Sequence, residues 1–170
     1  QTLLEGKTTV PASLWPNSYW TNTSLVPYPD DPPQAMALLD EAGYTDTNGD
    51  GIREGMCNGV ETKLSFDFET TDKQLRMDMA VATKDMLAQI GIEFKPIHTP
   101  SGTFFGDYSS GANMYTGKYD MAGYTTGFYP APYTDGFLCK NVTSADNLGG
   151  SNSYHMCYPE LDSLFALANS

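Results

Sequence analysis

Residues 64–98 read LSFDFETTDKQLRMDMAVATKDMLAQIGIEFKPIH, and this stretch decides the fold. From Leu64 to Glu69 apolar and polar residues alternate, which is the period of a β-strand. From about Lys73 to Ile90 apolar residues recur at steps of three and four, which predicts a helix, and Ile92–His98 has the composition of another strand. Strand, helix and strand in close succession predict a βαβ unit with parallel strands. The expected fold class is therefore α/β.

Further helices and strands are predicted on both sides of this unit. Asp30-Asp31-Pro32-Pro33 begins a helix, because acidic side chains cap free N–H groups and proline is tolerated in the first turn; Gly43 ends it. Residues 46–55 read as a loop, and residues 119–125 as a third strand. A short helix is expected from about Pro159. The pattern predicts a mixed sheet flanked by helices.

Composition limits the kinds of partner. A chain of 170 residues with 40% hydrophobic residues suits one folded domain. Its net charge of −12 disfavours nucleic acid and anionic membranes as partners. No apolar run approaches the roughly 20 residues that span a bilayer, so we expect no membrane insertion by this segment. The sequence opens without a signal peptide, and we interpret it as a segment of a longer chain.

The three cysteines favour an oxidising compartment. Cys139 and Cys157 enclose a stretch of 17 residues rich in Ser, Asn and Gly, which is a poor core former. A disulfide between them is predicted, and it would stabilise such a segment by roughly 3 kcal/mol. Only two histidines and no CxxC pair are present, which disfavours a zinc site. Cys57 is left over, either buried or as a free thiol.

The order of several motifs resembles that of bacterial extracellular solute-binding proteins of family 5, the peptide- and nickel-type receptors of ABC transporters. These motifs are DDPPQAMALLDEAGY (30–44), DTNGDGI (46–52), MLAQIGIE (86–93), KYDMA (118–122) and the closing Asn152, Tyr154, Pro159, Leu161 and Asp162. A comparable cysteine pair brackets a Gly-Ser-Asn-Tyr element in some dipeptide receptors, and Cys139 and Cys157 match it. The match extends over nearly the whole chain.

The resemblance implies a fold and a function. Residues 1–170 would be a single domain, part of the C-terminal lobe of a larger two-lobe protein with a type II periplasmic-binding-protein-like fold. The expected function is extracytoplasmic capture of an oligopeptide or oligosaccharide for an ABC importer, by closure of two lobes over the ligand. The implied partners are the transporter permease and the missing N-terminal lobe of the same chain. The implied location is the periplasm, or the cell surface through a lipoprotein anchor.

The loop after the third predicted strand is the candidate ligand site, because parallel α/β sheets bind ligands beyond the carboxyl ends of their strands. Its candidate residues are Tyr124, Phe128, Tyr129, Tyr133 and Asp135. Aromatic rings can stack on a ligand, and phenol hydroxyls can form hydrogen bonds with it; packing of the loop is the alternative role. Peptide receptors resembling this chain carry Asp-Pro where this sequence has Ala131-Pro132. In those receptors the aspartate holds the amino terminus of the peptide, and the aromatic loop of this chain resembles more closely that of relatives that bind oligosaccharides.

The acidic loop matches part of a calcium-binding pattern. Its candidate ligands are Asp46, Asn48, Asp50, the carbonyl of Ile52 and Glu54, at alternate positions of the loop. The twelfth position, which normally holds a bidentate glutamate, is Cys57. Two interpretations stay open: a structural calcium ion, or an Asx-rich turn that binds no ion. No cofactor is expected to be required for ligand capture.

Two other function classes are weighed against the receptor. A carbohydrate-active enzyme domain would need a working acid pair, such as Asp67 with Glu69 or Asp120 with Asp135. Asp67 and Glu69 fall opposite the apolar face of their strand, and we expect both to be solvated. No nucleophile elbow, HExxH motif or phosphate-binding loop is present, so an enzyme is not expected. A calcium-dependent adhesion module is the third interpretation, and Cys57 at the twelfth position argues against it.

Overall fold

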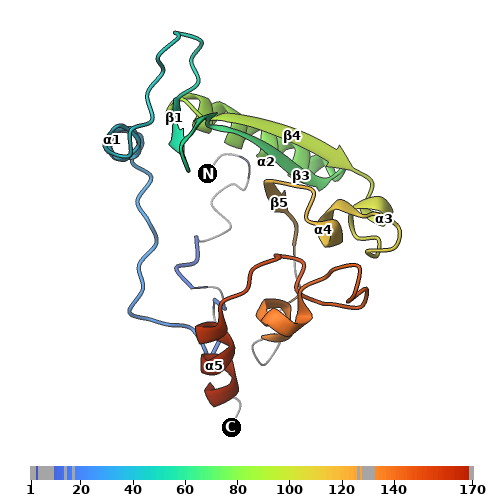
Figure 1. Cartoon of the computed structure of the whole chain (residues 1–170). Coiled ribbons are helices and arrows are strands. Elements are labelled where there is room, and N and C mark those ends of the chain that lie inside the picture. The colour runs from blue at the N-terminus through green and yellow to red at the C-terminus, as the bar shows by residue number, and fades with distance from the viewer. Residues whose placement is uncertain are drawn as a thin grey trace.

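The computed structural model of the chain describes residue 3 and residues 10–13, 15–16, 18–125, 127 and 133–168. Among these residues the main elements are α1 (Pro32–Glu41), β1 (Glu54–Cys57), β2 (Val60–Lys63), β3 (Ser65–Thr71), α2 (Gln74–Ala88), β4 (Glu93–Thr99) and β5 (Met121–Gly123). Shorter turns of helix are α3 (Ser101–Phe104), α4 (Asn113–Thr116), η1 (Asp135–Phe137) and η2 (Cys139–Asn141), and α5 (Pro159–Ala168) follows them. Figure 1 shows their arrangement.

The βαβ unit predicted from residues 64–98 is confirmed. β3 and β4 pair in parallel, from Ser65 beside Glu93 to Thr71 beside Thr99, and α2 connects them. β5 pairs in parallel with the other edge of β3, so the strand order is β4-β3-β5. Pro96 is tolerated within β4 because an edge strand has no second neighbour that would need its missing N–H group.

A hairpin that the sequence analysis did not predict follows the acidic loop, and its first strand begins at Glu54, within the range predicted as loop. β1 and β2 pair antiparallel and form a separate two-stranded sheet, so the parallel and antiparallel pairs do not share one sheet. Their turn is Asn58-Gly59, with φ values of 50° and 79°. Positive φ at both central residues defines the turn that best suits a two-residue hairpin, and Asn-Gly is its preferred sequence.

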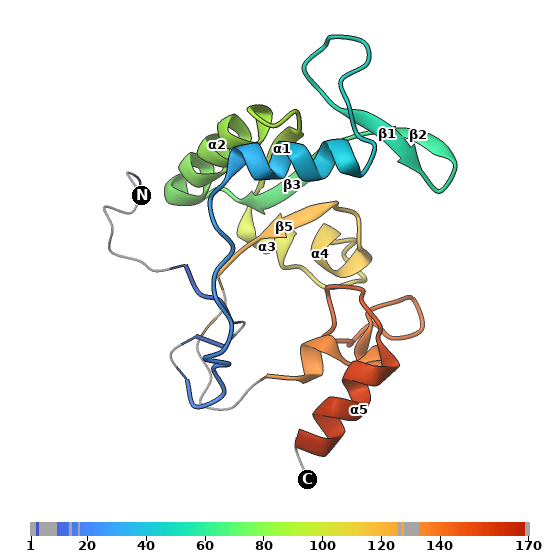
Figure 2. The same cartoon turned by 90° about the vertical axis from the view of Figure 1, so that its left-hand side faces the viewer.

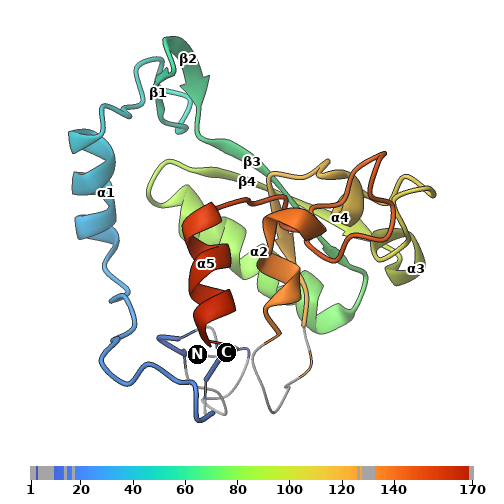
Figure 3. The ribbon, with the colours of Figure 1, turned by 60° about the horizontal axis from the view of Figure 1, so that its bottom comes forward.

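The first helix begins and ends where its sequence predicts. The Asp31 carboxylate accepts a hydrogen bond of 2.9 Å from the N–H of Gln34, and Pro32 occupies the first turn. After the helix, Gly43 has a φ of 84°. No residue of α1 is buried, and Leu38 is 58% exposed. Figures 1 and 3 show why: α1 lies at the margin of the molecule.

The core forms on both faces of β3. On one face Phe68 packs against Phe94 with ring centres 4.7 Å apart, and α2 covers this face (Figure 2). On the other face α3 and α4 contribute Phe104 and Met114, which are 0% and 3% exposed. Among the described residues, no helix combines the length and the apolar character needed to cross a bilayer.

The expectation that Glu69 is solvated is wrong. Glu69 is 2% exposed, and its carboxylate accepts hydrogen bonds from the Thr99 hydroxyl at 2.6 Å and the Asn113 amide at 2.9 Å. The polar side of β3 is covered by α3 and α4, which strand alternation alone does not reveal. Asp67, on the same side, keeps a half-exposed side chain and pairs with Lys95 at 2.9 Å. Glu69 is therefore part of the packing between the sheet and the short helices, whereas Asp67 stays at the surface.

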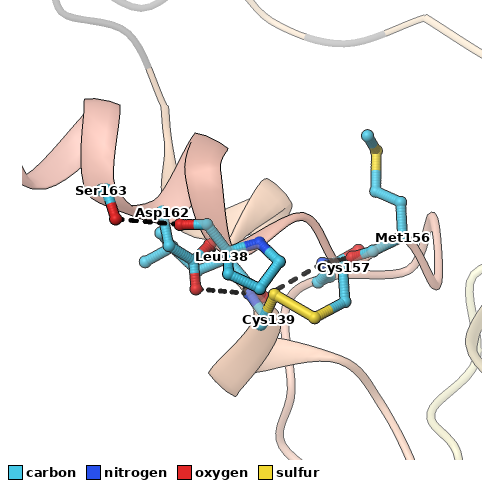
Figure 4. The surroundings of a disulfide bond; sticks show 8 residues. Leu138, Cys139, Met156, Cys157, Asp162 and Ser163 are labelled. Atoms are coloured by element: carbon cyan, nitrogen blue, oxygen red, sulfur yellow. Dashed lines mark hydrogen bonds between the residues drawn. A yellow bond between two sulfur atoms is a disulfide. The ribbon is translucent and has the colours of Figure 1, made fainter.

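The predicted disulfide joins the two ends of the C-terminal segment. Cys139 and Cys157 are bonded, with Cα atoms 4.5 Å apart, and Figure 4 shows the first turn of α5 beside them. The Asp162 carboxylate accepts the N–H of Cys139 at 3.1 Å, which ties α5 to η2. Trp15, near the N-terminus, contacts Phe165 edge to face at 6.5 Å. Cys57 is a free, exposed thiol.

Candidate ligand-binding surface

Tyr124 is the first residue after β5, at the carboxyl end of the sheet. Its hydroxyl donates a hydrogen bond of 2.9 Å to the hydroxyl of Tyr154. The Tyr154 ring lies parallel to that of Phe137, with ring centres 5.1 Å apart and planes 4° apart. Residues from β5, η1 and the disulfide-bonded segment thus meet at this edge of the sheet.

The other side of the Tyr124 ring is also held by aromatic contacts. Phe105 approaches it edge to face at 5.6 Å, and Phe104 lies at 6.4 Å. Together Phe104, Phe105, Tyr124, Phe137 and Tyr154 form what we term the aromatic cluster. Tyr154 is 44% exposed and Phe105 is 40% exposed, so the cluster combines fixed rings with accessible faces. Such rings can stack on a ligand.

The phenol of Tyr124 stays neutral over the physiological range. Burial raises the pKa of Tyr124, and the hydrogen bond with Tyr154 raises it further. Burial also raises the pKa of Tyr119, whose hydroxyl donates a 2.6 Å hydrogen bond to the carbonyl of Ser153. A neutral phenol can both donate and accept a hydrogen bond, which suits an uncharged polar ligand.

The predicted site residues are placed only in part. Tyr124 lies in the aromatic cluster, whereas Tyr133 lies against Gly136 and is 46% exposed. Asp135 is exposed at the start of η1, and its backbone carbonyl accepts the side chains of Asn141 and Ser151. Phe128, Tyr129 and the Ala131-Pro132 pair lie outside the described residues, so their assignments stay predictions.

Sequence analysis missed the partners of Tyr124. Tyr154 and Phe105 lie in segments distant from it in sequence, and no local period links them to it. Tyr154 belongs to the Gly-Ser-Asn-Ser-Tyr element that supported the disulfide, and the neighbouring Asn152 is fully buried. The Asn152 amide donates to the carbonyls of Leu138 and Met156 at 3.0 and 2.8 Å. These two residues directly precede Cys139 and Cys157, so the hydrogen bonds hold this element beside the disulfide. Tyr154, an aromatic residue inside this element, was the sequence feature that could have indicated a second part of the site.

An apolar hollow of about 380 Å³ lies beside the cluster, between α2 and the strands β3 and β5. Phe68, Met79, Phe94 and Met121 line its walls, and Tyr124 also borders it. Its polar rim includes Arg76 and Thr125, which are hydrogen-bonded to each other. The candidate surface therefore continues from the aromatic cluster into this hollow.

The acidic loop brings together three of its predicted metal ligands. Asp46, Asp50 and Glu54 each offer a carboxylate oxygen, and these oxygens lie within 4.8 Å of one another. The Asn48 amide donates to Glu54 at 3.0 Å, so its side chain lies in the same group. Ile52 takes part in the loop through its N–H, which donates to Asp50 at 2.9 Å. The N–H of Leu64 donates to the carbonyl of Arg53, which places the end of the loop at the start of β3, whereas Tyr124 follows the carboxyl end of β5.

The comparisons with known proteins agree with this architecture. Residues 1–148 match the family described as bacterial extracellular solute-binding proteins, family 5, middle part. The chain belongs to this family. Its members are binding proteins of transport systems and not enzymes, which agrees with the sequence-based prediction and does not favour the carbohydrate-active enzyme or the adhesion module.

Individual relatives add detail. The oligopeptide-binding protein AppA of Bacillus subtilis is 42% identical over 65 residues, which are 36% of this chain and 11% of AppA. The structure of AppA in complex with a nonapeptide matches 95% of this chain and 31% of its own, at 26% identity and a TM-score of 0.68. An oligopeptide-binding protein of Thermus thermophilus shares the fold over 98% of this chain and 30% of its own, at 22% identity and a TM-score of 0.79.

A third relative is bound to a sugar. The mannohexaose-bound periplasmic oligopeptide-binding protein of Thermotoga maritima matches 79% of this chain and 24% of its own, at 25% identity and a TM-score of 0.57. The likeness to these structures confirms the predicted type II lobe. The chain spans less than a third of the length of each of them.

Proposed function

We propose that this chain is part of the C-terminal lobe of a two-lobe solute-binding protein, and that it captures a ligand for an ABC importer by closing against the other lobe. Family membership supports the general function, and the short span relative to AppA supports the lobe assignment. The aromatic cluster at the carboxyl end of β5 is the observation that carries the proposal. In open α/β sheets this edge is where ligands bind.

The cluster has the chemistry of one wall of a closing cleft. Its rings are fixed to the sheet by Phe104, which is fully buried, while Tyr154 and Phe105 keep accessible faces. A wall that is already ordered loses little conformational entropy when the ligand arrives. The other lobe would then bury the ligand between two such walls and exclude water from it.

An oligopeptide or an oligosaccharide fits this wall. The relatives include a nonapeptide complex and a mannohexaose complex at nearly equal identity, 26% and 25%. Aromatic faces and neutral hydroxyls favour a sugar ring or an uncharged peptide backbone. A ligand with a free ammonium group would need a carboxylate, because an unpaired buried charge is costly. Asp135, on the same short helix as Phe137, is our candidate for that contact.

We also propose the surroundings in which this lobe works. The family is extracellular, and we place this protein in the periplasm or, through a lipoprotein anchor, at the cell surface. The Cys139–Cys157 disulfide supports an oxidising compartment. The permease of the importer would be its protein partner. Ligand capture itself would use no cofactor, and a calcium ion in the acidic loop would stabilise the lobe without contacting the ligand.

Thermal shift measurements on the complete protein would test this function. Melting temperatures would be recorded with panels of short peptides and of oligosaccharides. Ligand at about 100 times the dissociation constant adds roughly 2.7 kcal/mol of stability, a shift of several degrees. A shift with one panel supports the proposal and names the ligand class. If a Tyr124→Phe, Phe137→Ala double variant keeps the full shift, the aromatic cluster is not the ligand wall.

A further inference from the structure

Glu54 presents a buried carboxylate oxygen without a partner. The residue is 5% exposed, and its Oε1 accepts three hydrogen bonds: from the N–H of Thr47 at 3.3 Å, from the hydroxyl of Thr47 at 2.5 Å and from the amide of Asn48 at 3.0 Å. Its Oε2 is shielded from solvent and has no hydrogen-bond partner among the described residues. An ionised oxygen left in this state is costly, so the geometry points to a missing positive group.

Two further carboxylates near Glu54 add negative charge that a positive group would have to neutralise. Carboxylate oxygens of Asp46 and Asp50 lie within 4.8 Å of a carboxylate oxygen of Glu54 and of each other. The cation paired with this group is Lys63, which contacts the Asp50 carboxylate from β2. The neighbouring Arg53 does not neutralise the group, because its side chain pairs with Asp40. Among the residues that the structure describes, the three carboxylates thus share one lysine.

Hydrogen bonds within the loop fix the position of the Asp46 carboxylate. Both carboxylate oxygens of Asp46 accept backbone N–H groups, from Gly49 at 2.7 Å and from Gly51 at 2.9 Å. Gly49 and Gly51 have φ values of 79° and 86°, which residues with a side chain rarely adopt. Two oxygens bound to one calcium ion at about 2.4 Å can be no more than about 4.8 Å apart, so the observed separations fit a shared ion.

We propose that the loop from Asp46 to Glu54 binds a calcium ion, held by the carboxylates of Asp46, Asp50 and Glu54, by the side-chain oxygen of Asn48 and by the carbonyl of Ile52. All five are oxygen donors, which calcium prefers and which softer metals do not. Glu54 replaces the glutamate that is absent at the twelfth position of the calcium-loop pattern. That position, Cys57, is exposed within β1 and takes no part.

The ion would act on the stability of the lobe. Glu54 and Thr45 exchange two backbone hydrogen bonds of 3.0 Å, which close the loop at its base. The N–H of Arg53 donates to the carbonyl of Gly91 at 2.8 Å, which joins the loop to the segment after α2. The N–H of Leu64 donates to the carbonyl of Arg53 at 2.8 Å, which joins the loop to the start of β3. Ordering the loop therefore stabilises the first strand of the βαβ unit.

Calcium titration of the complete protein tests the proposal. With CaCl2 in place of EDTA we expect the melting temperature to rise by several degrees and titration calorimetry to give one ion per chain. MgCl2 should give a much smaller rise, since magnesium requires stricter octahedral geometry. No rise with CaCl2 and no heat of binding would overturn the proposal, and an equal rise with MgCl2 would overturn the assignment to calcium.

Two variants separate ion binding from loop folding. Glu54→Gln should abolish the calcium-dependent rise yet melt in EDTA at or above the temperature of the parent protein, because it removes the unpaired charge. Glu61→Gln, at an exposed position of the same hairpin, should keep the full calcium response. A Glu54→Gln protein that still gains stability from calcium would contradict the assignment of the ligands.

Discussion

The hydroxyl of Tyr124 donates a 2.9 Å hydrogen bond to the hydroxyl of Tyr154, across 30 residues of sequence. The bond joins the carboxyl end of the parallel sheet to the segment that the disulfide closes. Each phenol has an aromatic neighbour on its own side, Phe105 for Tyr124 and Phe137 for Tyr154. The orientation of the candidate ligand wall therefore depends on two parts of the chain that fold against each other.

Loss of this hydrogen bond should weaken ligand binding. In a Tyr124→Phe variant the ring stays in place, but the Tyr154 hydroxyl loses its donor. Since a hydrogen bond of this kind contributes about 1 kcal/mol, we expect affinity to fall by about fivefold. Calorimetric titration with the ligand found in the thermal screen measures this change in affinity. Tyr158→Phe, at a 58% exposed position, is the matched control and should bind normally.

The buried carboxylate of Glu69 should be needed for stability. A Glu69→Ala change would remove the acceptor from both the Thr99 hydroxyl and the Asn113 amide. Leaving such donors unpaired at a buried site costs roughly 2–3 kcal/mol, which urea unfolding would show as a lower midpoint. Asp67→Ala, two residues earlier on the same strand, should change the midpoint little, because its ion pair with Lys95 is half exposed. Equal effects of the two changes would refute this account.

Removing the disulfide should destabilise the C-terminal segment. Cys139→Ser with Cys157→Ser opens a loop whose two ends are 18 residues apart in sequence. Loop-closure entropy predicts a loss of roughly 3 kcal/mol. Unfolding in urea, followed by tryptophan fluorescence, reports on this segment, because Trp15 contacts Phe137 and Phe165. Cys57→Ser removes an exposed thiol and should leave the curve unchanged.

The elements with a clear hydrophobic period could be predicted from sequence. β3, α2 and β4 follow each other with strong alternation or helical spacing, and the predicted bounds agree with the structure within a few residues. Helix α1 is predictable from its Asp31 cap and its prolines, which act locally. The hairpin turn Asn58-Gly59 is an equally local signal, but the glycines and acidic residues before it favour a loop as far as Gly55, which hides the start of β1.

The candidate site depended on contacts that sequence does not display. Glu69 was expected to face water because strand alternation tells which side chains share a face, not what covers that face. Here α3 and α4, each only four residues long, cover it, and such short helices have no measurable period. For the same reason Tyr154 was not assigned to the site: its partner Tyr124 is distant in sequence, and the fold brings the two together.

Stability should fall at alkaline pH partly because of Tyr124. Burial and the bond with Tyr154 raise the pKa of Tyr124 in the folded protein above its ordinary value of 10.0. Above that pH the unfolded chain releases the phenol proton while the folded chain still holds it, so unfolding becomes more favourable as pH rises. Below it both states are protonated, and this contribution to stability is fully present.

We expect the difference in urea midpoint between the parent protein and Tyr124→Phe to shift in favour of the variant as pH rises above about 10. Lys63 and Lys95, whose pKa values are raised by their aspartate partners, also lose their contribution at high pH, but they do so equally in both proteins and cancel in the difference. A difference that stays constant from neutral to alkaline pH would mean that Tyr124 ionises as readily in the folded chain as in the unfolded one.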